Sequence, residues 1–95
     1  MAVSLALAVP ASAYAATGDF DYQGPRRPAV IYNPENGKCY ENEDSETGRM
    51  AHNGTDAPVM LYANGNCQGD SVQVAANATN DDFSFLSVKF LNPAG

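Results

Sequence analysis

Basic residues, histidine and cysteine are scarce in this 95-residue chain. It has five lysines and arginines against eleven acidic residues, one histidine and two cysteines. The resulting net charge of −6 argues against binding to nucleic acid or to anionic membrane surfaces, because both need a basic face on the protein. Acidity is compatible with calcium binding, but it is equally common in proteins that must stay soluble outside the cell.

The residues that catalysis requires are also few. His52 is the only imidazole, and the serines at 45, 71, 84 and 87 lie in no nucleophile elbow. Paired carboxylates such as Asp81 and Asp82 occur in glycosidases, but so small a domain leaves little room for a sugar cleft. We therefore expect no enzymatic activity.

No apolar run approaches the length of about 20 residues that a membrane span needs. The apolar run at 2–9 is instead followed by small residues, with Ala13 and Ala15 at the spacing that a signal peptidase reads. We expect a signal peptide over 1–15 and hence secretion, with cleavage after Ala13 as the competing site. No Lys or Arg precedes the run, as expected if translation starts upstream of Met1. The alternative for 2–9 is a short buried helix or strand.

The exported chain of about 80 residues buries too little apolar surface to be comfortably stable without help. Cys39 and Cys67 admit one intramolecular pairing, and an exported chain meets oxidants that would close it. Such a disulfide stabilises by about 3 kcal/mol through the unfolded state. Free thiols or a metal site are the alternatives, but one histidine cannot complete a tetrahedral zinc set with them.

No stretch of the exported chain has a helical period, whereas several short segments alternate or are rich in β-branched and aromatic residues. We therefore expect an all-β domain over 29–92, preceded by a flexible arm over 16–28. The expected strands are 29–33, 38–42, 49–53, 58–62, 71–74 and 83–90. An Asn-Gly turn should join the first two strands into a hairpin, and Gly54–Asp56 should form another turn.

The last expected strand changes phase, because Phe83 and Phe85 alternate on one side while Leu86, Val88 and Phe90 alternate on the other. This pattern predicts a bulge, or a strand that begins at Phe85. The expected core consists of Ile31, Leu61, Val72, Val74, Leu86, Val88 and Phe90.

The two halves of the chain also match one another. Ile31-Tyr32, an Asn-Gly pair and Cys39 are paralleled by Leu61-Tyr62, an Asn-Gly pair and Cys67. This parallel predicts a duplicated motif, with the disulfide joining one copy to the other.

The second half resembles the βγ-crystallin family. Residues 62–69 resemble its hairpin pattern of Tyr, four residues, an aromatic, one residue and Gly, with Cys67 in place of the aromatic and Ser71 following. Residues 80–85 resemble the microbial pattern of two Asn or Asp, two variable positions, a hydroxyl residue and Ser, with Phe85 in place of that Ser. The resemblance implies two Greek-key-like motifs forming a small sandwich, which we expect to be a monomer.

In this family calcium is shared between the polar loops of both motifs, and the resemblance implies the same here. Calcium takes six to eight oxygen ligands. The candidate ligands are Asn80, Asp81, Asp82 and Ser84 in one loop and Glu43, Asp44 and Thr47 in the other. Gly48 stands where a Ser would follow Thr47. The alternative is an Asx-rich turn that solvates two strand ends.

The sequence is therefore expected to encode a secreted, non-enzymatic binding or structural module with weak calcium binding. A neighbouring family of the same fold comprises secreted metalloproteinase inhibitors, which makes protease inhibition the second hypothesis. An inhibitor presents a rigid exposed loop to the enzyme cleft. The candidate loops are Asn33–Gly37 and Ala63–Gly69, each tied to a cysteine, and a secreted protease would be the partner.

Overall fold

Two four-stranded antiparallel sheets make up the fold in the computed structural model, which describes residues 15–92. The strands are β1 (Gly18–Gln23), β2 (Pro28–Tyr32), β3 (Cys39–Glu41), β4 (Arg49–Thr55), β5 (Val59–Asn64), β6 (Gln68–Val74), β7 (Thr79–Asn80) and β8 (Ser87–Phe90), and a 3₁₀ helix, η2 (Glu43–Ser45), lies between β3 and β4. The all-β prediction is confirmed. The predicted signal peptide lies, except for Ala15, outside the described residues.

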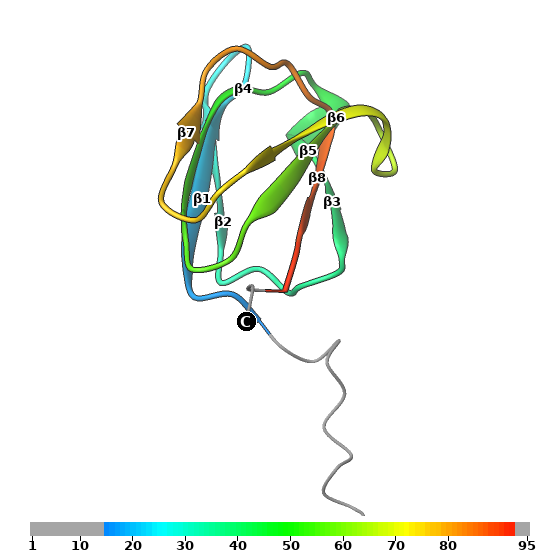
Figure 1. Ribbon diagram of the computed structural model, residues 1–95. Coiled ribbons are helices and arrows are strands. Elements are labelled where there is room, and N and C mark those ends of the chain that lie inside the picture. The colour runs from blue at the N-terminus through cyan, green and yellow to red at the C-terminus, as the bar shows by residue number, and fades with distance from the viewer. Residues whose placement is uncertain (1–14, 93–95) are drawn as a thin grey trace, which may run out of the picture.

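The first half of the chain forms β1–β4 and the second half forms β5–β8, and each sheet combines three strands of one half with one strand of the other. The strand order is β2-β1-β4-β7 in the first sheet and β3-β8-β5-β6 in the second. The first, second and fourth strands of each half thus share one sheet, while the third strand of each half, β3 or β7, crosses to the opposite sheet (Figure 1). The two halves are therefore interlocked, because each complete sheet contains a strand from the other half.

The core lies between the two sheets and is rich in aromatic rings. Phe20 and Tyr22 of β1 pack against Phe85, in the segment before β8, and Phe90 of β8. The ring centroids are 5.4 Å apart for both Phe20–Phe90 and Tyr22–Phe85. These edge-to-face contacts add to the free energy of burying the rings. The other buried members of the core cluster are Ala29, Ala51, Val59, Leu61, Val74 and Val88.

The predicted core is mostly confirmed. Leu61, Val74, Val88 and Phe90 are buried, and Ile31 and Val72 are partly buried against them. Leu86 is only half-buried and lies outside the cluster. The phase change before β8 arises because the strand begins at Ser87, while Phe85 pairs separately with Gly48 and still points into the core.

The prediction of a flexible arm over 16–28 is wrong. Residues Gly18–Gln23 form β1, which lies between β2 and β4 in the first sheet. Phe20 is completely buried and Tyr22 nearly so, while the alternating Asp19 is exposed and Asp21 is half-buried. The folded domain therefore begins well before residue 29, because this alternation supplies a quarter of the first sheet.

The predicted hairpin between 29–33 and 38–42 is also wrong. β2 pairs with β1, and β3 pairs with β8 in the second sheet, where Tyr40 lies opposite Val88. The connection crosses between sheets and is anchored by the backbone N–H of Gly37, which donates to the carbonyl of Phe90 at 2.7 Å. The hairpin of the first sheet is instead formed by β1 and β2.

The predicted disulfide between Cys39 and Cys67 is confirmed. Cys39 begins β3 and Cys67 lies in the loop between β5 and β6, so the bond joins the two halves of the chain across 28 residues. β3 is the edge strand of the second sheet, so the disulfide ties this strand to the loop between β5 and β6 of the same sheet.

Candidate functional site

The two polar segments proposed for calcium are neighbours in the fold. The backbone of Gly48 exchanges two hydrogen bonds with Phe85, at 2.8 and 3.0 Å. The Asn42 amide spans the same junction, donating to the carbonyls of Glu46 and Phe85, both at 2.9 Å. The structure therefore brings the loop at 43–47 beside the loop at 80–85, as a shared site would require.

Gly48 is required at this junction. A Cβ atom there would lie 2.8 Å from the Tyr22 ring, 2.9 Å from the Asn42 amide nitrogen and 2.9 Å from the Phe85 ring. The position at which the crystallin pattern has a Ser thus has no room for a side chain. Phe85, at the other departure from the pattern, is fully buried, so neither position offers a hydroxyl ligand.

The acidic residues of the first loop face arginines. Arg27 lies 3.5 Å from a Glu43 carboxylate oxygen and 3.8 Å from one of Asp44, and Arg26 pairs with Glu46. A cation bound here would have to compete with these guanidinium groups for Glu43 and Asp44. Thr47, the third candidate in this loop, is exposed.

The Tyr22 hydroxyl fixes the start of this loop by accepting a hydrogen bond from the Glu43 backbone N–H at 3.0 Å. Burial raises the pKa of the Tyr22 phenol, and the Glu43 carboxylate raises it further, while the backbone hydrogen bond opposes both effects. Tyr22 therefore stays protonated at neutral pH and serves as an anchor.

The second loop is an Asx turn. The side-chain oxygen of Asn80 accepts hydrogen bonds from the backbone N–H groups of Asp82 and Phe83, at 2.9 and 3.0 Å. Asp81, Asp82 and Ser84 are exposed around it. Within residues 15–92, no three His, Cys, Asp or Glu side chains lie close enough together to hold a metal ion. Calcium here would therefore need amide, hydroxyl and backbone oxygens in addition to carboxylates.

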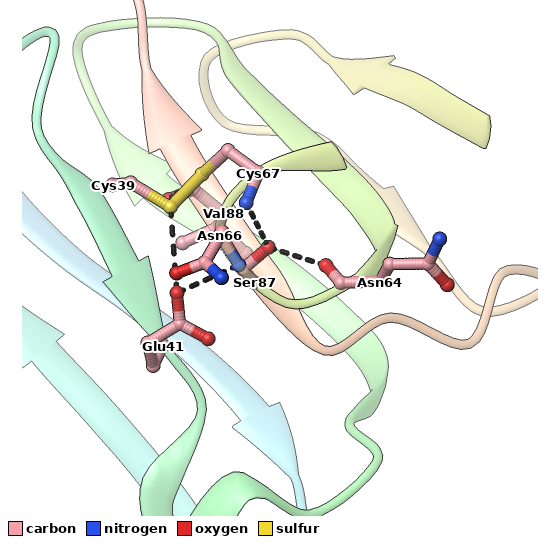
Figure 2. The surroundings of a disulfide bond; sticks show 7 residues. All are labelled: Cys39, Glu41, Asn64, Asn66, Cys67, Ser87 and Val88. Carbon is pink, nitrogen blue, oxygen red and sulfur yellow. Dashed lines mark hydrogen bonds between the residues drawn. A yellow bond between two sulfur atoms is a disulfide. The ribbon is translucent and has the colours of Figure 1, made fainter. Parts of the chain in front are cut away.

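The hairpin loop between β5 and β6 is held from two sides beyond the disulfide (Figure 2). Ser87 accepts a hydrogen bond from the Cys67 backbone N–H at 2.8 Å and donates one to the Asn64 carbonyl at 2.6 Å. Glu41 accepts one from the Asn66 backbone N–H at 2.8 Å. The loop projects from the body of the molecule (Figure 1), so it combines exposure with a fixed backbone.

The other candidate loop, Asn33–Gly37, is not presented in this way. Pro34 and Asn36 are buried, and the Asn36 amide donates to the carbonyl of Leu91 at 2.8 Å. This segment is the crossing between the sheets, and its backbone is committed to the fold rather than to an exposed turn.

The side chain of His52, the one imidazole of the chain, contacts a threonine rather than one of the serines considered as nucleophiles. Its Nδ1 lies 2.9 Å from the Thr79 hydroxyl on the outer face of the first sheet. Ser87, the buried serine, uses its hydroxyl in both of the loop contacts described above. The structure thus assigns these two residues to strand contacts.

Ser87 and Glu41 hold the hairpin loop, but no local pattern in the sequence marks them for this role, because each acts on a segment at least 20 residues away. Asp19 and Asp21 do carry a signal in the sequence, which is their alternation with Phe20 and Tyr22.

Comparison of the chain with protein-family models, with curated proteins and with solved structures finds no match in any of the three. Within residues 15–92, no helix is long and apolar enough to cross a membrane.

Proposed function

We propose that this protein is a secreted, non-enzymatic binding or structural module built from two Greek-key-like motifs of the βγ-crystallin kind. The observation that carries the proposal is the exchange of the third strands, β3 and β7, between the two sheets. Two four-strand units related in this way fit a duplicated Greek key better than a simple meander. The disulfide supports export, because such bonds persist in oxidising compartments.

Calcium is the ligand we propose for the paired loops. The support is the junction of the two polar segments at Gly48 and Phe85. The site is weak, with a dissociation constant of about 10⁻⁵ to 10⁻³ M, because two positions lack hydroxyls and Arg27 faces Glu43 and Asp44. The ligands that remain are Asn80, Asp81, Asp82 and Ser84, with Thr47 beside them.

Calorimetric titration of the oxidised protein with calcium tests this proposal. We expect saturable binding in the range given above, and its loss in an Asp81→Ala/Ser84→Ala variant, because that variant removes two of the exposed oxygen donors. The control is Asp70→Ala on β6, which removes the same single negative charge as the double variant. It should bind calcium as the parent protein does. The absence of both binding heat and a calcium-dependent rise in Tm would contradict calcium binding but not the proposed fold.

Inhibition of a secreted protease is the second candidate, and the hairpin loop favours it. Asn64 and Asn66 are exposed at its tip, while the disulfide, Ser87 and Glu41 fix the backbone behind them. A loop that is already ordered loses less entropy when it enters an enzyme cleft. The crossing segment Asn33–Gly37 is set aside as a candidate because Pro34 and Asn36 are buried and tie it to the fold.

A Cys39→Ser/Cys67→Ser variant tests this candidate. The oxidised protein should inhibit at least one member of a panel of secreted metalloproteases, and the variant should inhibit it about tenfold less because the loop is no longer preorganised. The variant should also lose about 3 kcal/mol of unfolding free energy, so assays belong well below its Tm, measured by circular dichroism. Equal inhibition by both forms would contradict the role of the loop.

A further inference from the structure

The outer face of the first sheet gathers the exposed apolar side chains of the described chain. In residues 15–92 the exposed large apolar residues are Val30, Tyr32 and Met50, which are 38%, 73% and 51% accessible. Val30 and Tyr32 lie on β2 and Met50 lies on β4, both strands of this sheet. Isolated exposed apolar residues need no explanation, but a shared face indicates an interaction surface.

A groove of about 580 Å³ crosses this face. Val30 and Met50 line it together with three carboxylates, Asp19, Asp21 and Asp81. No lysine or arginine is among the described residues that line it. The groove is therefore both apolar and negatively charged, and charge complementarity favours a cationic partner.

The two arginines in the connection between β1 and β2 do not neutralise the groove, because they are engaged elsewhere. Arg26 and Arg27, in the connection between β1 and β2, pair with Glu46, Glu43 and Asp44 around η2. His52, which also lines the groove, makes its Nδ1 contact with Thr79. Arg49, beside Met50 on β4, is not among the residues that line the groove. The ion pairs found among residues 15–92 include neither Asp19 nor Asp21, so both carboxylates are available to a cationic ligand.

The strand register places an apolar side chain beside each carboxylate of β1. Asp21 lies opposite Val30, and Asp19 lies opposite Tyr32. Alternate residues on a strand are about 6.8 Å apart, which is also the spacing of alternate side chains in an extended peptide. Arginine fits both neighbours, since its aliphatic stem packs on apolar surface and its guanidinium pairs with a carboxylate or stacks on a tyrosine ring.

We propose that this face binds an extended segment of a partner protein that carries arginines at alternate positions, one for Asp19 and one for Asp21. A second copy of this chain is disfavoured, because both copies would carry a net charge of −6. The inference rests on the proposed role as a binding module. It uses a surface separate from the hairpin loop and, apart from Asp81, from the proposed calcium ligands.

An NMR titration of the ¹⁵N-labelled, oxidised protein with the acetylated and amidated peptide GRSRSG tests the proposal. EDTA is included so that calcium plays no part. We expect saturable shift changes confined to β1, β2 and β4, with a Kd of about 1 mM. The peptide GQSQSG should not bind, and GRRSSG, with adjacent arginines, should bind more weakly although its charge is the same.

Two variants with the same change in net charge locate the site. Asp19→Asn/Asp21→Asn should weaken binding about tenfold, at about two- to fivefold for each exposed ion pair. Asp70→Asn/Glu35→Gln, at exposed positions outside the groove lining, should leave binding unchanged. The amide spectra report directly whether each variant is folded.

Three outcomes would overturn the proposal. The first is no binding up to about 10 mM peptide. The second is equal weakening of binding by the two double variants. The third is equal binding of GRSRSG and GRRSSG, which would indicate general attraction of a cationic peptide to an acidic protein. None of them bears on calcium titration or protease inhibition, so failure here is distinguishable from failure of the proposed function.

Discussion

Replacing Val88 with aspartate is expected to unfold the protein. Val88 is 1% exposed in β8, where its Cα is paired with Leu61 on one side and Tyr40 on the other. The new carboxylate would be buried without a partner, which costs several kcal/mol. A small domain has only about 5–10 kcal/mol of stability to lose, so we expect no cooperative thermal transition by circular dichroism.

The control for this prediction is Lys89→Asp. Lys89 is the next residue on β8 and is only half-buried, with its side chain on the opposite face of the sheet. The Lys89→Asp variant introduces the same residue into the same strand and should remain folded, with a loss of about 1 kcal/mol of unfolding free energy. A soluble Val88→Asp protein that melts cooperatively near the parent Tm would show that β8 faces the core with the opposite phase.

The strand missed in the sequence shows how local signals compete. Asp19-Phe20-Asp21-Tyr22 alternates with period two, as a half-buried strand should. Gly18 precedes it, and Gly24, Pro25 and Pro28 follow it closely, so the segment has the composition of a loop. Tertiary packing decides the outcome, because Phe20 and Tyr22 fill the space between the sheets.

The internal repeat was placed at the wrong offset. The structure divides the chain into β1–β4 and β5–β8, so β1 and β5 are the first strands of their halves. Ile31-Tyr32 therefore lies on a second strand while Leu61-Tyr62 lies on a first one. Short matches of an aromatic, an Asn-Gly pair and a cysteine do not specify register, because turn residues recur at the end of every hairpin.

The candidate loops were placed correctly along the chain, but their partners were not predictable. Spacing identifies polar segments between strands, and both proposed calcium segments are indeed inter-strand loops. Pairing of Arg27 with Glu43 and Asp44 depends on how the connection between β1 and β2 folds over η2. Such a contact is non-local, so no window along the sequence contains it.

Asn53 was expected at the end of a strand before a turn, and the structure places it within β4 and fully buried. Its amide nitrogen donates to the carbonyl of Ala57 at 2.8 Å and lies 3.2 Å from those of Val74 and Ala75. Its side-chain oxygen accepts from the backbone N–H and the hydroxyl of Thr55, at 3.1 and 2.7 Å. One side chain thus connects β4 to the end of β6 in the other sheet.

We expect Asn53→Ala to cost about 3 kcal/mol of unfolding free energy, because it leaves several buried backbone groups without a partner and opens a small cavity. Asn64→Ala, the same change at an exposed position, should cost within about 0.5 kcal/mol. Urea unfolding of both variants measures the difference. A loss below about 1 kcal/mol for Asn53→Ala would show that water replaces the amide and that this contact does not hold the sheets together.

Asn53→Asp sharpens the test because it keeps the shape of the side chain and changes only the donor. At neutral pH a carboxylate oxygen would face the carbonyls of Ala57, Val74 and Ala75, so this variant should be less stable than Asn53→Ala. Burial and these carbonyls raise the pKa of the new carboxyl group above its unfolded value of about 3.9. The deficit relative to the parent should therefore grow as the pH rises above about 4 and shrink below it. A deficit independent of pH would mean that the carboxylate reaches solvent, and that β4 is not buried against the connection from β6 to β7.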